Sequence, residues 1–275
     1  MGSRLGANAY GKAEVRVVKV TRGAERHLLR DLTADVSLRG HFEAVHVDGD
    51  NSGLPATDTM RNVVYALAAE HPLESLPDFA ATLAGHFAGL ELVELATVRL
   101  REHPWERLDA HAWQRGAGGT RVHVAEAGTG GVRHAGGIDE LLVLRSSGSG
   151  FSGFERDRHT TLPETEDRIL ATIVTADWDH AGVPGEDAWA ATRDTLLRAF
   201  TDHFSPSVQF TLHRMGTAVL EADPGLERIH LTLPNRHHLP YDVSRFGIDD
   251  RGEVFHATSE PFGVIEATVE RSAPA

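Results

Sequence analysis

The sequence predicts an α+β fold in which one arrangement of strands and helices occurs twice. Apolar residues alternate with polar ones over short runs, which is typical of half-buried strands, and recur at helical spacing in four longer runs. The order of strands, two helices and strands is found in each half of the chain. We therefore expect a duplicated unit whose antiparallel sheet is covered on one face by a pair of helices.

The first half begins with strand-like runs at residues 12–20 and about 26–48. Two helices follow, and their apolar residues are Met60, Val63, Val64 and Leu67 in the first and Phe79, Leu83, Phe87 and Leu90 in the second. Pro72 ends the first helix, and Ser75 and Pro77 start the second. Alternation then returns, with Ala96, Val98 and Leu100 on one face and Thr97, Arg99 and Arg101 on the other.

The second half repeats this order. Strands are expected at about 138–147 and 168–178, and again near 226–237 and 253–270. Between them lie a helix with Trp189, Leu196, Phe200 and Phe204 and a second helical segment at about 207–222. The glycine-rich stretches 116–119 and 128–137 predict loops near the junction.

Composition excludes several classes of protein. The chain has no cysteine, which removes disulfides, thiolate nucleophiles and cysteine-ligated zinc. Its formal charge is −13 and we find no basic stripe, so a nucleic-acid partner is not expected. No apolar run approaches the ~20 residues of a membrane span, and no signal-peptide pattern opens the chain. We expect a soluble intracellular protein.

Several familiar site patterns are incomplete. Gly128-Thr-Gly-Gly131 follows a strand but precedes no helix, so it does not predict a dinucleotide loop. Neither lysine follows a P-loop, and Gly150-Phe-Ser-Gly153 lacks the spacing of a nucleophile elbow. The 17 histidines are mostly scattered, and we expect no metal site.

Lysine is rare in this chain, which has only Lys12 and Lys19 beside a large excess of arginine. A compact, titratable amine is one function that arginine cannot supply. Lys12, in Tyr10-Gly-Lys12 at the start of a strand, is the better candidate, whereas Lys19 reads as an ordinary surface charge. The alternative is that both lysines are ordinary surface residues.

A further polar cluster continues the strand near residue 233. Extending the alternation of Ile229, Leu231 and Leu233 places Asn235 and His237 on one face, which indicates either a polar pocket or a strand end in water. Four other segments accompany it: Tyr10-Gly-Lys12, Ala56-Thr-Asp-Thr59, Phe154–Leu162 leading to Glu164–Arg168, and Ser207-Val-Gln209. Together they resemble the urate oxidase (uricase) family over residues 10–271, with Asn51-Ser52 and Pro261-Phe-Gly263 also in place.

The resemblance implies a tandem T-fold, with two antiparallel four-stranded sheets that each carry a helix pair. The units would span 10–137 and 138–271. It also implies a tunnel-forming homotetramer with active sites at subunit interfaces. The implied reaction, in purine catabolism, converts urate, O₂ and water to 5-hydroxyisourate and hydrogen peroxide without any cofactor or metal.

The resemblance further assigns the site residues. Urate would be bound by Asp58, Phe151, Arg168, Val208, Gln209 and Asn235. Lys12, Thr57 and His237 would form a proton relay, and Thr57 and Asn235 would hold O₂ or water. On the residues alone other roles stay open: helix caps for Thr57 and Asp58, an ion pair for Arg168, a helix start for Gln209 and a core ring for Phe151.

Two departures from the family pattern concern the wall of the site. His159 stands where an aromatic residue is common, and Ser152 replaces a common tryptophan beside Phe151. The chain ends Arg-Ser-Ala-Pro-Ala and not in a peroxisomal Ser-Lys-Leu, which with the arginine bias predicts a bacterial cytoplasmic enzyme. The alternatives are a cyclohydrolase-like T-fold enzyme of purines or pterins and a non-catalytic purine-binding tetramer.

Overall fold

The computed structural model describes residues 3–272. The C-terminal residues 273–275, on which the predicted localisation was partly based, lie outside the described residues. The chain divides into two compact units. The first runs to Gly137 and includes Asp179–Trp189, and the second comprises Ile138–Trp178 and the residues from Ala190 onward. The T-fold boundaries 10–137 and 138–271 stay a prediction. None of the described helices is long and apolar enough to cross a membrane.

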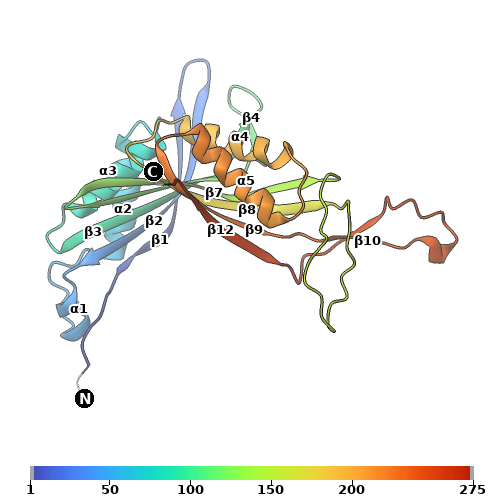
Figure 1. Ribbon diagram of the computed structural model, residues 1–275. Coiled ribbons are helices and arrows are strands. Elements are labelled where there is room, and N and C mark those ends of the chain that lie inside the picture. The colour runs from blue at the N-terminus through green and yellow to red at the C-terminus, as the bar shows by residue number, and fades with distance from the viewer. Residues whose placement is uncertain (1–2, 273–275) are drawn as a thin grey trace. The chain divides into compact units, whose positions relative to one another are not determined.

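The first unit contains an antiparallel sheet with the strand order β1-β2-β3-β6. These strands are β1 (Tyr10–Arg22), β2 (His27–Gly40), β3 (Val93–Glu102) and β6 (Thr120–Gly128). Helices α2 (Thr57–Glu70) and α3 (Leu76–Ala88) cover one face of the sheet (Figure 1). The core between them is fully buried and includes Leu38, Met60, Leu83 and Val98.

Helix α2 ends and α3 begins where the sequence predicts, but α3 ends at Ala88, before the predicted Leu90. The Ser75 side chain accepts a hydrogen bond from the Asp78 N–H at 3.2 Å, which caps the start of α3, and α2 ends at Glu70, before Pro72. At the far end of α2, Lys19 Nζ donates to the carbonyl oxygens of Ala68, Ala69 and His71 at 2.9, 3.2 and 2.5 Å. Lys19 therefore caps the C-terminus of the helix and is not an ordinary surface charge.

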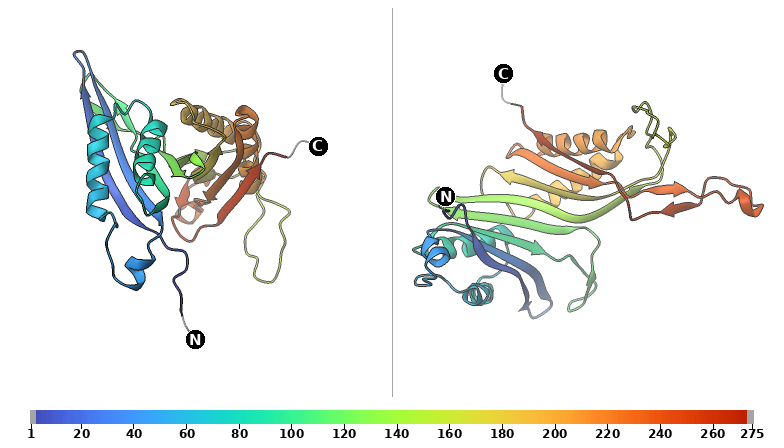
Figure 2. Two further views of the ribbon diagram at one scale, coloured as in Figure 1. Left: turned by 90° about the vertical axis from the view of Figure 1, so that its left-hand side faces the viewer. Right: turned by 90° about the horizontal axis from the view of Figure 1, so that it is seen from below.

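The second unit repeats the architecture with the strand order β7-β8-β9-β12. Its elements are β7 (Gly131–Arg145), which begins in the first unit, β8 (Leu170–His180), β9 (Leu226–Pro234), β12 (Val264–Glu270), α4 (Ala188–Thr201) and α5 (Val208–Ala222). Helix α5 packs on β9 and β12, which pair antiparallel (Figure 2). The predicted α+β architecture of two strands, two helices and two strands, used twice, is confirmed.

Several predicted boundaries were wrong. The strand expected to reach residue 48 ends at Gly40 and is followed by the short helix α1 (Glu43–Val47). Only glycine fits at position 40, because a Cβ there would lie 1.9 Å from the Leu92 carbonyl oxygen. Most of the expected loop 128–137 is the first half of β7. Phe204 lies beyond α4 and is exposed.

The last part of the chain carries a long excursion between β9 and β12, which interrupts the strands expected at 226–237 and 253–270. It contains β10 (His238–Pro240), the 3₁₀ turn η1 (Ser244–Phe246) and β11 (Phe255–Ala257), with β10 and β11 paired antiparallel (Figure 1). A smaller hairpin, β4 (Trp105–Arg107) and β5 (Trp113–Arg115), lies between β3 and β6.

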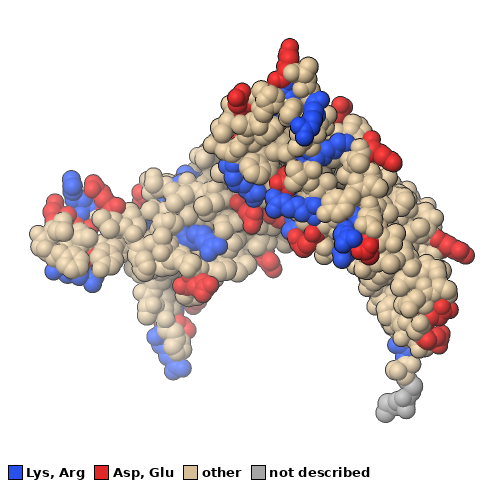
Figure 3. Space-filling view, turned by 180° about the vertical axis from the view of Figure 1, so that it is seen from behind, with Lys and Arg blue, Asp and Glu red and all other residues tan. Residues whose placement is uncertain are grey.

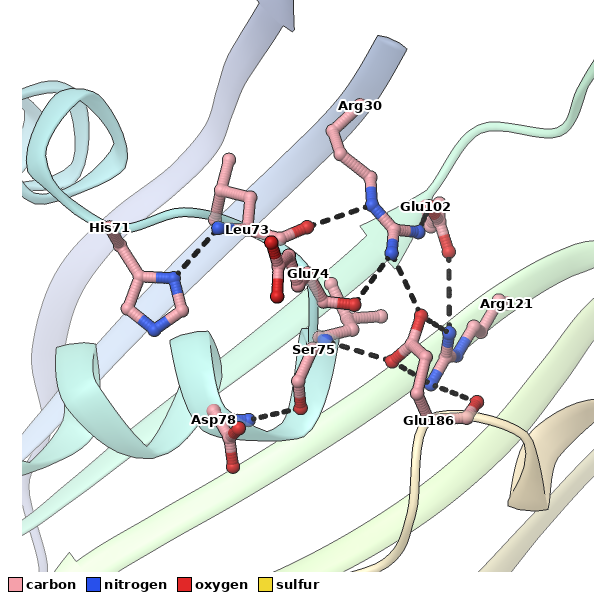
Figure 4. A network of polar contacts seen from close by, with 10 residues as sticks. Arg30, His71, Leu73, Glu74, Ser75, Asp78, Glu102, Arg121 and Glu186 are labelled. Atoms are coloured by element: carbon pink, nitrogen blue, oxygen red, sulfur yellow. Dashed lines mark hydrogen bonds and ion pairs between the residues drawn. The ribbon is translucent and has the colours of Figure 1, made fainter. Parts of the chain in front are cut away.

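Charged side chains cluster in the first unit around Glu186. Its carboxylate accepts from Arg121 at 2.7 and 3.0 Å, from Arg30 at 2.9 Å and from the Leu76 N–H at 3.0 Å (Figure 4). Glu102 pairs with the same two arginines. The two carboxylates and two guanidiniums balance in charge, and they join the start of α3 to strands β2, β3 and β6. On the face seen in Figure 3, acidic and basic side chains are interspersed.

Candidate active site

Lys12 lies on β1 directly opposite Val36, a core residue of β2. Opposite residues of an antiparallel pair project to the same face, so Lys12 points to the face that carries α2 and is half-buried there. Gly11 is needed beside it, because a Cβ at this position would lie 1.8 Å from the Val36 carbonyl oxygen. The Tyr10-Gly-Lys12 motif thus has a local structural reason.

Tyr10 joins the start of β1 to the segment that precedes α2. Its hydroxyl donates to the Pro55 carbonyl oxygen at 3.3 Å, and its ring packs edge-on against Phe42 with centroids 4.7 Å apart. Burial raises the pKa of Tyr10 to about 12, so the phenol stays protonated. This contact holds the first turn of α2 to the end of β1 that bears Lys12.

Thr57 and Asp58 are the first two residues of α2, and both are exposed. The N-cap is Ala56 and no side chain caps the N-terminus of this helix, so the capping role that the sequence left open for Thr57 and Asp58 was wrong. Asp58 pairs with Arg61 at 2.7 Å and accepts from Asn62 Nδ2 at 3.1 Å. The Thr57 hydroxyl is thus free of a capping role.

In the second unit, Phe151 and Arg168 lie on adjacent segments. Phe151 exchanges backbone hydrogen bonds with Thr165, and the Arg168 N–H donates to the Ser149 carbonyl oxygen at 2.7 Å. The carboxylate of Asp167 accepts from the Ser147 hydroxyl and the Gly148 N–H at 2.7 and 2.8 Å, which lowers the pKa of Asp167 and pins the loop. These bonds bring the Arg168 guanidinium 5.2 Å from the centre of the Phe151 ring.

Arg168 is a cation that lacks an anionic partner. It forms no ion pair within residues 3–272, and its Nε is buried without a hydrogen-bond partner. Burial lowers the pKa of Arg168 from its usual value, although a guanidinium stays charged. The ion-pair role left open for Arg168 was therefore wrong. A buried, unpaired guanidinium is suited to a ligand that presents acceptor oxygens.

Phe151 is half-buried and belongs to the wall of a cavity, not to the core. Phe154 stacks on it with centroids 4.9 Å apart and an interplanar angle of 12°. Phe154 therefore supplies aromatic surface next to Ser152, which is exposed. His159 lies in an exposed turn, where its N–H donates to Asp157 at 2.8 Å, and it does not line the cavity.

Asn235 and His237 face each other, as the alternation predicted, but not because the strand continues. Strand β9 ends at Pro234, and the Asn235 N–H donates to the Gly263 carbonyl oxygen at 2.8 Å. The Asn235 amide nitrogen lies 3.4 Å from His237 Nδ1. The Asn235 amide and the His237 ring are therefore within hydrogen-bond distance of each other.

One cavity of about 520 Å³ is shared by Phe151, Arg168, Asn235 and His237. Its wall also includes residues that sequence reasoning missed, and these are Leu162, Pro163, Thr165, His238, Leu239 and Phe255. The volume lies in the range of small-molecule sites, and the wall is mostly apolar with a few convergent polar groups. No three histidine or acidic side chains among the described residues are arranged to hold a metal ion.

Val208 and Gln209 open helix α5, which Ser207 caps by accepting from the Phe210 N–H at 3.1 Å. Val208 is buried and Gln209 is exposed, and neither lines the cavity. Their segment is nevertheless adjacent to the Phe151 segment, because the Gly150 N–H donates to the Ser205 carbonyl oxygen at 2.8 Å. The helix-start position of Gln209 is confirmed, and its amide remains available to a ligand.

The predicted residues are thus distributed over both units. Lys12, Thr57 and Asp58 belong to the first, and Phe151, Arg168, Val208, Gln209, Asn235 and His237 belong to the second. Comparison with known families adds a decisive observation, because a family model described as uricase matches residues 8–128 and 134–266. The chain belongs to the uricase family.

Known uricases resemble the chain along nearly its whole length. The uricase of Arthrobacter globiformis is 43% identical over 97% of this chain and 90% of its own, and that of Dictyostelium discoideum is 38% identical over 96% of both. The crystal structure of the Arthrobacter globiformis uricase superposes with a TM-score of 0.95 at 41% identity, covering 100% of this chain and 97% of the other. The tandem T-fold predicted from the motifs is therefore confirmed.

Proposed function

We propose that this chain is a urate oxidase that converts urate, O₂ and water to 5-hydroxyisourate and hydrogen peroxide without a metal or organic cofactor. Membership of the uricase family supports this reaction. The structural observation that carries it is the cavity in which the unpaired Arg168 guanidinium lies with Phe151, Asn235 and His237. The two alternative functions have no such support from the relatives.

Urate is a flat purine with carbonyl and N–H groups along its edges. The planar fork of Arg168 is suited to two parallel hydrogen bonds with one edge. The Gln209 amide and the Val208 backbone would bind the opposite edge, since an amide both donates and accepts. Phe151 offers a ring face for stacking, and Asp58 would contribute from the start of α2. This set fixes the orientation of the purine.

Chemistry requires that bound urate lose a second proton and then transfer electrons to O₂. Lys12, Thr57 and His237 would carry this proton, with the Thr57 hydroxyl between an amine and an imidazole. Asn235 lies within hydrogen-bond distance of His237 and would hold O₂, and later water, together with Thr57. In the balanced reaction one oxygen atom from water enters the product, and O₂ takes up two electrons and two protons to form peroxide.

We further propose that the site is completed by a second copy of the chain, as the family resemblance implies. We place Lys12, Thr57 and Asp58 of one chain against the cavity of a neighbour in a homotetramer. The excursion between β9 and β12 exposes large apolar side chains, and these are Leu239, Tyr241, Phe246, Ile248 and Val254. Surfaces of this kind are often covered by a partner.

The reaction is tested by mixing protein in excess chelator with urate and following urate absorbance and peroxide together. We expect both to change in equal molar amounts, and added flavin, copper or iron to leave the rate unaltered. Activity that is lost in chelator and returns with one metal would contradict the proposal.

A further inference from the structure

Strand β1 contains a β-bulge immediately after Lys12. Lys12 pairs with Val36, and the next regular pair is Val15 with Ala34, so Ala13 and Glu14 both stand opposite Asp35. One extra residue in a strand exchanges the two faces for everything that precedes it. The alternation of β1 is therefore interrupted between Lys12 and Val15.

The bulge decides which way Lys12 points. Val15 and Val17 are buried against the helices, and in a regular strand Lys12 would project to the opposite face. Because of the extra residue, Lys12 shares the face of Val15, which α2 covers. Tyr10 obeys the same rule, since it reaches Phe42 and Pro55 on that face.

Three polar groups hold the bulge from the other face of the sheet. Glu14 has a φ of 58°, a left-handed conformation that is unfavourable for most residues other than glycine. Its N–H donates to Asp35 Oδ1 at 2.7 Å. Arg101 pairs with Asp35 Oδ2 at 3.2 Å and with the Glu14 carboxylate. Asp35 thus fixes the backbone of the bulge, and Arg101 fixes Asp35.

Strand β7 also contains a residue with a positive φ, which is Glu140 at 60°. The residue two positions before it is the fully buried Ile138, whereas the residue two positions before Glu14 is Lys12.

We propose that Asp35 and Arg101 are positioning residues that hold the Ala13-Glu14 bulge and so direct the Lys12 amine to the face of β1 that carries the start of α2. This inference rests on the proposed function for the role of Lys12 and extends it to residues that do not touch the ligand. Since Lys12 acts in proton transfer and not in binding, loss of the bulge changes turnover and leaves urate affinity nearly intact.

Two pairs of variants distinguish loss of the bulge from a general loss of protein stability. Asp35→Ala removes the acceptor, and Glu14→Val places a β-branched residue at positive φ, so each should lower kcat roughly 10- to 100-fold with KM changed by less than about threefold. Asp35→Asn keeps an acceptor oxygen and Glu14→Gly accepts the same φ, so each should retain most activity. Arg133→Ala, which breaks the pair of an exposed arginine with Glu126 at 2.7 Å, is the matched control and should change nothing.

An untethered amine provides a sharper comparison. In Lys12→Ala protein supplied with methylamine, the base is no longer attached to β1. Adding Asp35→Ala to this variant should therefore lower the methylamine-rescued rate by less than about threefold. A loss as large as in the native background would show that Asp35 acts on the site in general, and it would overturn the inference.

A readout independent of catalysis uses the fact that Lys12 and Lys19 are the only lysines. Protein labelled with ¹³C-lysine gives two Cε–Hε signals. In Asp35→Ala and Glu14→Val the Lys12 signal should move while the Lys19 signal stays, and in Arg133→Ala neither should move. Unmoved signals, or equal movement of both, would reject the positioning role. Absence of urate oxidation by the unaltered protein would instead reject the proposed function, and the labelling experiment would still decide this one.

Discussion

Lys12 and Lys19 project from the same face of β1 and lie toward opposite ends of helix α2. Lys19 donates to the last carbonyl groups of the helix, and Lys12 follows Tyr10, whose hydroxyl is bonded to the segment before Thr57. The Tyr65 hydroxyl, donating to the Arg16 carbonyl oxygen at 3.0 Å, joins helix and strand between them. Lys19 therefore has a structural role at the end of the helix, whereas the chemical role proposed for Lys12 lies toward its start.

The first prediction concerns Lys12. Lys12→Arg keeps the positive charge but cannot accept a proton at working pH, so the rate of urate oxidation should fall by about 10²–10⁴ with little change in urate binding. Steady-state kinetics and inhibitor binding measure the two effects separately. A Lys12→Arg enzyme with an unaltered rate would remove Lys12 from the proton relay.

The second prediction concerns Lys19. Lys19→Met leaves three helix-end carbonyl groups without their charged donor, so the free energy of unfolding should fall by about 1–2 kcal/mol. Denaturant unfolding measures this, with Arg39→Met, at an exposed site on β2, as the control. Equal stability of the two variants would show that Lys19 is only a surface charge.

The third prediction follows from a buried histidine pair. His123 Nε2 lies 3.0 Å from His134 Nδ1, and burial lowers the pKa of His123 to about 3, with further lowering by His134, His180 and Arg121 against the opposing Glu186. Burial lowers the pKa of His134 also. In the unfolded chain the histidine pKa is about 6.5, so below this pH the unfolded chain binds protons that the folded protein does not. The free energy of unfolding is therefore highest above this pH and declines as the pH falls below it.

Unfolding free energies measured between pH 7.5 and 5 test this dependence. His123→Phe, which removes one titrating group, should flatten the decline. Each pKa unit corresponds to about 1.4 kcal/mol, so the effect is measurable. An identical slope in His123→Phe would contradict the assignment of the decline to this pair.

The sequence predicted the helices well because their signals are local. Ser75 starts its helix as expected and caps it, and Ser207, at the start of the second helical segment of its half, caps α5. The glycines at 131, 136 and 137 led to the wrong prediction of a loop, because strand β7 is maintained by its neighbouring strands and no local pattern reveals this. The redirection of Lys12 was equally hidden, since the run 12–20 reads as one strand although the bulge exchanges its faces.

The site was predictable in part from the residues and in part only from the resemblance. The alternation near residue 233 predicted that Asn235 and His237 share one face, and the two side chains do lie together. Their arrangement results from the hydrogen bond between Asn235 and Gly263, because strand β9 ends before them. No spacing links Arg168 to Phe151, because bonds from Ser149 and Thr165 bring their segments together in three dimensions. The motif order of the family supplied what local patterns lack.

The fourth prediction tests the shared site. Lys12→Met chains and Arg168→Ala chains should each be inactive alone. After subunit exchange, some interfaces combine the intact Lys12 of one chain with the intact Arg168 of its neighbour, so activity should partly return. Exchange is verified by mass measurement of mixed tetramers. Verified mixing without recovered activity would indicate that each chain builds its own site.

The last prediction separates binding from proton transfer. Arg168→Lys keeps a charge but loses the fork that makes two parallel hydrogen bonds. Hydrogen bonds to charged groups contribute about 1.5–3 kcal/mol each, so loss of one should weaken ligand binding by at least about tenfold. A competitive purine-trione analogue, which needs no proton removal, should lose affinity in Arg168→Lys and keep it in Lys12→Arg. Calorimetry measures both, and an equal loss in the two variants would show that binding and proton transfer are not divided between Arg168 and Lys12.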